Sequence, residues 1–309
     1  MQVLVTGGAG FIGSHSVEKL LQDGWTVRVL DNFSSGSRQN LPAHSRLTII
    51  EGDIRDFETV KTAMEGVSHV LHLAAQVSVQ ASVEHPPNSC SINILGFVNV
   101  LEAARSLGVA RMVYASSAAV YGHPMRLPIM ETDECRPISP YGLEKQVNDQ
   151  YAKLFREAFH LSLLGLRYFN VYGPRQDPRS PYAGVISKFL DRIDQHQPLL
   201  VYGDGSQTRD FIFVQDVARA NVAALRNDMT GVCHVATGKS WDLLHMIEIL
   251  SSCTKCRLEI VHQAPLVGDI PFSSANTDRF HNLLDPADLM PLEQGMSLLV
   301  QGMIGVRSA

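Results

Sequence analysis

The sequence predicts an α/β fold: a doubly wound parallel β-sheet with helices on both faces, and a smaller α/β lobe interleaved with it. Two observations predict this fold. Short apolar runs alternate with longer helical patterns, which is typical of parallel sheets joined by crossover helices. The short runs are apolar throughout instead of alternating with polar residues, as strands covered on both faces are. At 309 residues and 45% hydrophobic, the chain can bury such a core.

The expected elements follow in chain order. The strands are Gln2–Val5, Thr26–Leu30, Leu47–Ile50, His69–Leu73, Met112–Ala115 and Leu161–Leu166. The helices between and after them are Ile12–Gln22, Cys90–Leu107 and Tyr141–His160. After about Val171, proline and glycine punctuation indicates a second lobe. The helical pattern Val214–Arg226 and the strand-like run Val232–Ala236 would return to the first lobe, and Trp241 would begin a helix of the second.

The composition argues against several classes of protein. A formal charge of −5 gives no basic field for nucleic acid or an anionic membrane, so neither is an expected partner. A strand and a glycine motif follow Met1 directly, so we expect no secretion signal. No run approaches the roughly 18 apolar residues of a transmembrane helix, so we expect none and a cytoplasmic protein. The five cysteines are scattered, and Cys253 and Cys256 have no second pair or flanking histidines. We therefore expect free thiols and no metal site.

A glycine motif links the first strand to the first helix. Gly7, Gly10 and Gly13 are spaced G-x-x-G-x-x-G, which allows a tight turn and lets a pyrophosphate approach the free amides of a helix N-terminus. Asp31 ends the next strand, where a carboxylate accepts both hydroxyls of an adenosine ribose and repels a 2′-phosphate. This favours NAD over NADP in a Rossmann-type domain. Asp53 and Ile54 follow the third strand; Asp53 could position the adenine or could cap a helix.

A second motif carries candidate catalytic residues. Tyr141 and Lys145 stand at i and i+4, on one face of a helix. The ammonium, together with the positive nicotinamide of NAD, would lower the pKa of Tyr141 and make it a usable base. Ser116 and Ser117 end a predicted strand at the carboxyl edge of the sheet, where α/β proteins bind ligands. Ser117 would relay a proton between substrate and Tyr141. Alternatively, Tyr141 and Lys145 lie on a solvated helix face, and Ser117 is a plain turn residue.

Together these motifs resemble the extended short-chain dehydrogenase/reductase family of NAD-dependent epimerases and dehydratases, and within it the UDP-hexose 4-epimerases. The resemblance spans almost the whole chain. The matching stretches are Thr6–Gly13, Asp31–Asn32, Gly52–Ile54, His72–Ala75, Asn93 with Gly96, Ser116–Gly122, Ser139–Lys145, Leu166–Gly173 and Gly203–Phe211. It implies an NAD-binding Rossmann domain over residues 1–170, with a return at about 209–236, and a sugar-nucleotide lobe mainly over 171–309.

The resemblance also implies roles for individual residues. The NAD site would be lined by Gly7, Gly10, Phe11, Ile12, Gly13, Asp31, Asn32, Asp53, Ile54, Leu73, Ala74, Ala75, Asn93, Ala115, Tyr141, Lys145 and Phe169. The substrate would contact Ser116, Ser117, Tyr141, Asn170, Arg209 and Ser273. Asn170 and Arg209 would hold the diphosphate; alternatively, Arg209 pairs with Asp210 or Asp216. The helices Cys90–Leu107 and Tyr141–His160 would form the interface of a homodimer.

The implied reaction is 4-epimerisation of a nucleotide-diphosphate hexose through transient oxidation. Relatives that eliminate or decarboxylate carry an acid just after the residue matching Ser117, whereas this chain has Ala118 and Ala119. A 4-reductase, an epimerase of a uronic acid or of a non-UDP substrate, and a non-catalytic NAD sensor are the alternatives. Small Ser273 would leave room for an acetamido group. Leu266 and Pro271 stand where relatives have arginine, which leaves the nucleotide open.

Overall fold

A computed structural model describes residues 1–176, 184–265 and 270–307, with side chains up to residue 302. Leu266 lies outside the described residues. The main sheet has seven parallel strands in the order β10-β6-β5-β4-β1-β2-β3. Its strands are β1 (Gln2–Thr6), β2 (Thr26–Asp31), β3 (Leu47–Glu51), β4 (His69–His72), β5 (Arg111–Ser117), β6 (Leu163–Tyr168) and β10 (Gly231–Val235). The predicted fold class is confirmed.

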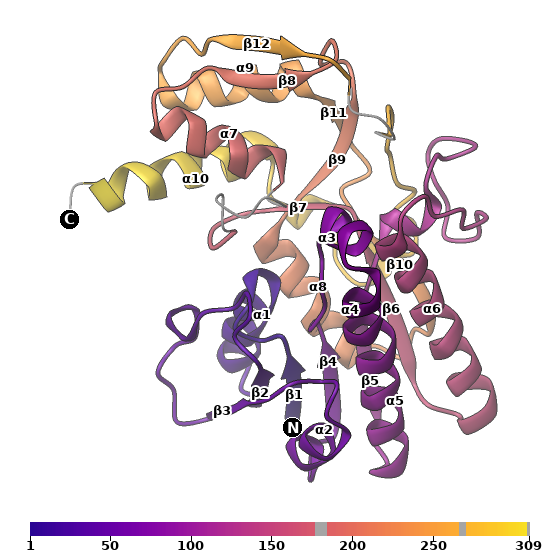
Figure 1. Cartoon of the computed structure of the whole chain (residues 1–309). Coiled ribbons are helices and arrows are strands. Elements are labelled where there is room, and N and C mark those ends of the chain that lie inside the picture. The colour runs from indigo at the N-terminus through magenta and orange to yellow at the C-terminus, as the bar shows by residue number, and fades with distance from the viewer. Residues whose placement is uncertain (177–183, 266–269, 308–309) are drawn as a thin grey trace.

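Helices cover both faces of this sheet (Figure 1). On one face lie α1 (Phe11–Gln22) and α8 (Val214–Arg226), and on the other lie α2 (Phe57–Met64), α5 (Gly96–Ser106) and α6 (Pro140–Phe159). Each face has its own apolar core, in which the strands contribute Val and Leu to both sides, as their unbroken apolar pattern predicts. The strand order reverses between β1 and β4, which places a ligand-binding crevice at the carboxyl ends of these two strands.

The segment before α5 differs from the expected single helix Cys90–Leu107. Helices α3 (Val79–Glu84) and α4 (Pro86–Cys90) come first, and a π-helical turn, Ser91–Leu95, joins α4 to α5. Helical structure therefore begins before Cys90. Pro86 starts α4 because a proline at the first helical position has a suitable φ and no amide that needs a partner.

The second lobe lies beside the main sheet (Figure 1). It has its own apolar core. Its strands are β7 (Asn170–Tyr172), β9 (Thr208–Phe213) and β11 (Ser240–Asp242) in one sheet, and β8 (Leu199–Tyr202) and β12 (Ile260–Gln263) in another. Its helices are α7 (Val185–Asp194), α9 (Leu243–Thr254) and α10 (Leu292–Arg307). The prediction that Trp241 begins a helix is wrong, because Trp241 lies in β11. Asp242 accepts the amide of His245 and so starts α9 at Leu243.

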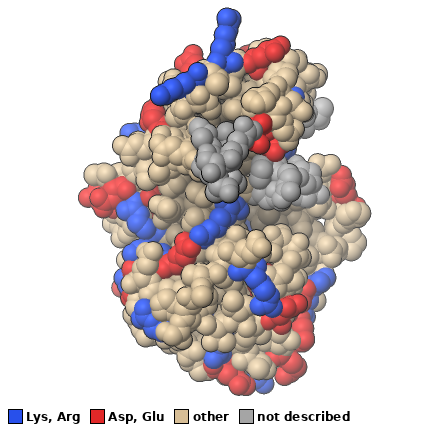
Figure 2. Space-filling model, turned by 90° about the vertical axis from the view of Figure 1, so that its left-hand side faces the viewer, with Lys and Arg blue, Asp and Glu red and all other residues tan. Residues whose placement is uncertain are grey.

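Short 3-10 turns complete the described chain: η1 (Arg38–Asn40), η3 (Ala118–Tyr121), η4 (Phe280–Asn282) and η5 (Pro286–Asp288). Acidic and basic side chains are interspersed on the face that Figure 2 shows, without a broad field of one sign. All five cysteines are free thiols. Within the described ranges, no helix has the length and apolar character needed to cross a membrane. The same ranges hold no group of three or more His, Cys, Asp or Glu placed to bind a metal ion.

Candidate active site

The glycine motif forms a tight turn between β1 and α1. Gly7 has a φ of +69°, and a Cβ on it would lie 2.6 Å from the amide nitrogen of Ala74. A Cβ on Gly13 would lie 2.1 Å from the carbonyl oxygen of Gly7, so the start of α1 packs directly on the turn. Gly10 is the N-cap of α1 and provides no side chain to cap it. The helix N-terminus, which includes Phe11 and Ile12, can therefore present its amides to a phosphate.

Asp31 holds this turn against β2. Its Oδ2 accepts the amide of Ala9 at 2.9 Å, and its Oδ1 accepts the amide of Phe33 at 2.8 Å. The carboxylate is thus fixed at the carboxyl end of β2, beside the glycine turn. This geometry fits the ribose of a bound dinucleotide, for which an acceptor in this place is required.

Asp53 is not a helix cap, which was one of the two expectations for it. The cap of α2 is Asp56, which accepts the amides of Glu58 and Thr59. Asp53 instead accepts hydrogen bonds from Arg55 and from the Asn32 side-chain amide, the latter at 3.0 Å. The hydrogen bond from Arg55 is the main reason that the pKa of Asp53 falls to about 2.

The neighbouring Ile54 is buried. A Cβ on Gly96 would lie 2.5 Å from the Ile54 side chain, so Ile54 packs directly on the start of α5. Asn32, Asp53 and Ile54 therefore lie along the same part of the sheet edge as Asp31.

The segment after β4 is held by hydrogen bonds to Thr6 and to the buried side-chain amide of Asn93. Leu73 and Ala74 donate their amides to the Thr6 carbonyl oxygen and the Thr6 hydroxyl, at 3.0 and 3.3 Å. The Asn93 side chain accepts the amide of Gln76 at 2.9 Å and donates to its carbonyl oxygen at 2.8 Å. Asn93 therefore fixes the path of residues 73–76, including Ala75, across the crevice beside the glycine turn.

Two further residues of this network were missed by the sequence analysis. Glu144 accepts a hydrogen bond from Asn93 at 2.6 Å and another from Ser89 at 2.8 Å. Glu144 is 4% exposed and stands inside the Y-x-x-x-K motif, between Tyr141 and Lys145. Its contacts join residues far apart in the sequence, so no local pattern could have identified it.

Tyr141 and Lys145 lie in the first two turns of α6. Ser139 caps the helix by accepting the amide of Gly142 at 3.1 Å. A Cβ on Gly142 would lie 2.6 Å from the carbonyl oxygen of Ala119, so α6 packs closely on η3, which follows Ser117. Lys145 Nζ donates to the carbonyl oxygen of Ala115 at 3.0 Å and lies 5.9 Å from the centre of the Tyr141 ring. The helix and the end of β5 thus bring the three predicted residues together.

Burial sets the electrostatics of the cluster in the NAD-free protein. It raises the pKa of Tyr141 above its ordinary value, a hydrogen bond with Ser117 offsets part of this rise, and the charge of Glu144 adds to it. The expected lowering of this pKa by Lys145 together with the nicotinamide of NAD stays a prediction. Burial also lowers the pKa of Lys145 to about 8, while Asp149 and Glu144 act in the opposite direction. Tyr141 is thus a neutral hydroxyl at pH 7.

Ser117 has two roles in the structure. Its hydroxyl accepts the amide of Ala119 at 3.1 Å, which caps η3, and it also faces Tyr141. The turn-residue alternative and the relay hypothesis are therefore compatible. Ser116 is 2% exposed and precedes it at the same strand end. Phe169, at the end of β6, is also buried, in a small apolar cluster with Val120 and Tyr121.

The other residues expected to contact substrate, Asn170, Arg209 and Ser273, lie on the second lobe's side of this edge. Asn170, on β7, donates to the carbonyl oxygen of Asp210 at 3.2 Å, and Arg209, on β9, donates to the carbonyl oxygen of Thr208 at 2.9 Å. The Asp210 carboxylate accepts the amides of Thr237 and Gly238, both at 2.8 Å. Asp216 accepts a hydrogen bond from Arg219 at 2.6 Å. Both carboxylates proposed as alternative partners of Arg209 are therefore engaged with other groups.

Ser273 belongs to a segment that runs between the two lobes. Pro271 accepts the amide of Thr208 at 2.9 Å, and the Ser273 carbonyl oxygen accepts the Ser240 hydroxyl at 2.7 Å. Ala275 forms a β-bridge with Ile129. This segment connects the strand that carries Arg209 to the loop that follows η3.

Comparisons with known proteins agree with this geometry. A sequence profile of the NAD dependent epimerase/dehydratase family matches residues 3–236. The UDP-glucose 4-epimerase of Mycolicibacterium smegmatis is 35% identical over 307 residues, covering 97% of this chain and 98% of the relative.

Two solved structures also match nearly the full chain. One is the UDP-N-acetylglucosamine 4-epimerase of Methanobrevibacter ruminantium in complex with UDP-N-acetylmuramic acid, with a TM-score of 0.93, 37% identity and coverage of 99% and 98%. The other is the UDP-glucose 4-epimerase of Thermus thermophilus in complex with NAD, with a TM-score of 0.90, 37% identity and coverage of 99% of both chains. The family resemblance that the motifs indicated is confirmed, and the chain belongs to the NAD-dependent epimerase/dehydratase family.

Proposed function

We propose that this protein is an NAD-dependent 4-epimerase of nucleotide-diphosphate hexoses. The observation that carries the proposal is the buried arrangement of Ser117, Tyr141 and Lys145 at the carboxyl edge of the sheet, beside the glycine turn. Ala118 and Ala119 follow Ser117, so no acid stands where elimination would require one. Reversible oxidation at carbon 4 of the sugar is the simplest reaction that this set of groups supports.

Each residue of the cluster has a distinct task in this proposal. Tyr141 removes the proton of the sugar 4-hydroxyl, directly or through Ser117, and returns it in the reverse step. Lys145, fixed on the Ala115 carbonyl oxygen, stabilises the phenolate. Bound NAD supplies the redox chemistry and is restored within each turnover, so no external redox partner is needed. Its diphosphate would lie on the N-terminus of α1 and its ribose on Asp31, where the free helix amides and the fixed carboxylate fit these groups.

The second lobe would hold the nucleotide diphosphate. Asn170 and Arg209 lie on the paired strands β7 and β9, with Asn170 opposite Phe211 and thus two residues from Arg209 in register. The planar guanidinium of Arg209 suits phosphate oxygens. Anchored there, the oxidised sugar could turn and present its other face. The related structures solved with UDP-N-acetylmuramic acid and with UDP-glucose support UDP as the nucleotide.

Proton NMR tests this proposal directly. The purified protein, with and without added NAD, is incubated with UDP-galactose, UDP-N-acetylgalactosamine and UDP-galacturonate in separate samples. Conversion of a substrate to its 4-epimer without net NADH formation would support the proposal and assign the sugar class. Net formation of NADH together with a 4-keto sugar would indicate a 4-reductase, which runs in its oxidative direction when only NAD and the 4-hydroxy sugar are supplied. No conversion of any substrate would reject a UDP-hexose 4-epimerase and direct attention to Pro271 and to other nucleotides.

We expect Ser273 to set the size limit near carbon 2 of the sugar. Tyrosine at this position would fill the space that an acetamido group needs. Ser273→Tyr should therefore lower kcat/KM for the N-acetylated substrate by about 10–200-fold relative to UDP-galactose. Ser273→Ala keeps the side chain small and is the matched control, with an unchanged ratio of the two kcat/KM values. Equal effects of Ser273→Tyr on both substrates would contradict this assignment.

We also propose that the protein is a homodimer that pairs the α5–α6 faces of two copies. Leu143 and Leu154 are 52% and 56% exposed and lie three turns apart on one face of α6, and Leu95, just before α5, is 51% exposed. The helices α5 and α6 run side by side on the outside of the sheet (Figure 1). Sedimentation velocity should give the mass of a dimer for the wild type. For the double variant Leu95→Glu/Leu154→Glu it should give the mass of a monomer. A wild-type monomer would reject this proposal.

A further inference from the structure

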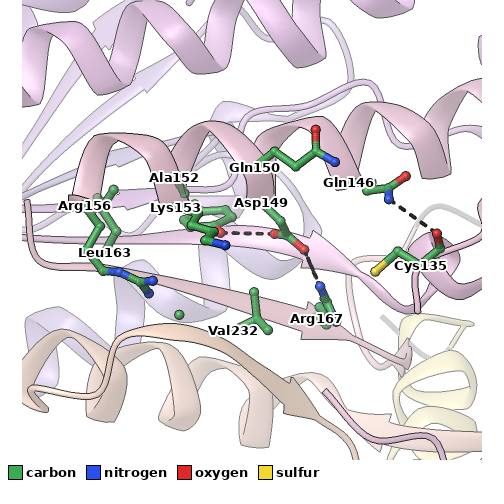
Figure 3. A pocket seen from close by; sticks show the side chains of 12 residues that line it. Cys135, Gln146, Asp149, Gln150, Ala152, Lys153, Arg156, Leu163, Arg167 and Val232 are labelled. Atoms are coloured by element: carbon green, nitrogen blue, oxygen red, sulfur yellow. Dashed lines mark hydrogen bonds and ion pairs between the residues drawn. The ribbon is translucent and has the colours of Figure 1, made fainter. Parts of the chain in front are cut away.

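A buried ion pair lies under α6, one helical turn beyond Lys145. Arg167 donates from Nε and NH2 to one carboxylate oxygen of Asp149 at 3.0 and 2.9 Å, and the two side chains are 6% and 9% exposed. The Tyr114 hydroxyl donates to the other oxygen at 3.1 Å. Asp149 and Arg167 point toward one another beside a cavity of about 330 Å³ (Figure 3). Because both oxygens of Asp149 have donors from the protein, the pair needs no ligand in that cavity.

The positions of these two residues tie the helix to the sheet. Tyr141, Lys145 and Asp149 stand at i, i+4 and i+8 on α6, so they share one face of the helix. Arg167 lies on β6 directly opposite Ser116 of β5. The ion pair therefore joins the helix that carries Tyr141 and Lys145 to the strand beside the serine pair. A shift of α6 along the sheet would break it.

Arg167 also connects to the second lobe's side of the site. It donates to the Tyr121 hydroxyl and to the carbonyl oxygen of Glu131. The Tyr121 hydroxyl and His234 Nε2 are 2.6 Å apart, and His234 Nδ1 lies 3.0 Å from the carbonyl oxygen of Asn276. A carbonyl only accepts, so Nδ1 carries the proton and Nε2 accepts from Tyr121. Burial lowers the pKa of His234, which keeps this ring neutral. The chain of hydrogen bonds fixes Arg167 from the side away from Asp149.

The carboxylate acts on Lys145 through space. Burial lowers the pKa of Lys145 to about 8, and the charge of Asp149 is the largest influence that raises it, followed by Glu144. From β4, His72 faces the same ammonium, and its own pKa is lowered to about 3, so it carries no charge near neutral pH.

The groups that face Asp149 are Arg167, Ser116 and the neutral Tyr114. Burial raises the pKa of Asp149, and the charge of Arg167 together with the hydrogen bonds to the carboxyl group acts against that rise and favours the carboxylate. Asp149 thus supplies much of the negative charge that keeps Lys145 protonated.

We propose that Asp149, fixed by Arg167, is a positioning residue that keeps the Lys145 ammonium charged and seated on the Ala115 carbonyl oxygen. The effect of Asp149 on turnover rests on the proposed function. The carboxylate accepts hydrogen bonds from Arg167 and Tyr114 and faces Ser116, and its influence on Lys145 is electrostatic. Removing its charge without changing its shape should therefore act on Lys145 first, and on turnover only through Lys145.

The first test is the titration of Lys145 in the NAD-free protein. Lysine labelled with ¹³C at the ε-carbon reports each ammonium by NMR, and Lys145→Met assigns the resonance. Asp149→Asn should lower the pKa of Lys145 by about one unit or more relative to the wild type. Glu157→Gln makes the same charge change on the same helix, at a side chain 57% exposed, and should leave the titration unchanged. An unchanged Lys145 titration in Asp149→Asn would overturn the proposal.

A second variant covers the case in which Asp149→Asn does not fold. Asp149→Asn leaves the Arg167 charge buried without its counterion, whereas Asp149→Asn/Arg167→Gln removes both charges. The double variant should also titrate Lys145 below the wild type, because the attraction of Asp149 is lost in both. A wild-type titration in the folded double variant would equally reject the proposal.

The second test is the pH profile of kcat/KM with saturating NAD. Activity that needs the Lys145 ammonium is full below its pKa and falls as the pH rises through it. For Asp149→Asn the basic limb should therefore move to lower pH, with a loss of about fivefold at pH 8 for a shift of one unit, recovering toward pH 6. A uniform loss at every pH would indicate a purely structural role and overturn the proposal. If the wild type epimerises none of the substrates, the proposed function fails while the NMR titration still decides the role of Asp149.

Discussion

Tyr141→Phe should lower kcat by a factor of about 10²–10⁴, the usual contribution of a positioned acid or base. Phenylalanine retains the ring and its packing, so the protein should fold and bind NAD as before. Only the hydroxyl that faces Ser117 is removed. The measurement is single-substrate epimerisation by NMR, together with NAD binding by calorimetry.

The chain offers a matched control for this change. Tyr151 stands on the same helix, half-buried against the core between α6 and the sheet. Tyr151→Phe removes a hydroxyl of the same kind at a distance from Ser117, and kcat should be unchanged. If Tyr141→Phe retains kcat within about threefold of the wild type, Tyr141 is not the base and the proposed mechanism is wrong.

Gly13→Ala should abolish NAD binding and destabilise the fold by about 1–3 kcal/mol. The new Cβ would lie 2.1 Å from the Gly7 carbonyl oxygen and 2.8 Å from the Gly8 Cα. Both neighbours are backbone atoms of the glycine turn, so neither can rotate away as a side chain could. The turn must move, and with it the surface offered to the pyrophosphate. Denaturant unfolding and NAD titration calorimetry measure the two effects.

Gly302→Ala is the corresponding control. Gly302 lies in α10, and no atom of the described residues lies within 4 Å of its Cβ position, so alanine should leave NAD binding intact. In a helix interior it should stabilise by roughly 0.5–1 kcal/mol. Wild-type NAD affinity in Gly13→Ala would show that the close approach of α1 to the turn is not required for binding.

The sequence predicts the sheet and the two principal motifs because their signals are local. Unbroken apolar runs mark strands buried on both faces, and the glycine spacing and Y-x-x-x-K depend only on residues close in the chain. By contrast, Trp241 was assigned to a helix because an apolar pattern follows it, whereas the Asp242 cap shifts the helix start to Leu243. Asp53 and Asp56 are equally good caps by composition, and only the backbone path selects Asp56.

The rest of the site depends on contacts between distant parts of the chain. Glu144 binds Asn93 and Ser89, and Asp149 binds Arg167, yet in the sequence both acids resemble solvent-facing residues of an amphipathic helix. The pKa of Tyr141 follows burial, which no motif encodes. The substrate side is the least predictable, since Asn170, Arg209 and Ser273 come from three separate segments whose meeting is decided by the second lobe.

The late return of the chain to the main sheet affects how the molecule unfolds. β10 forms the sheet edge beside β6, and α8 covers β1 and its neighbours together with α1, although both elements follow β9 in sequence. Because α8 also contacts β7 and β9 of the second lobe, we expect the two lobes to unfold in one cooperative transition. Trp25 and Trp241 lie in different lobes and can each report it by fluorescence in the reciprocal Trp→Phe variants. Coincident midpoints would make the two lobes a single thermodynamic unit, in which a ligand bound at their junction stabilises both.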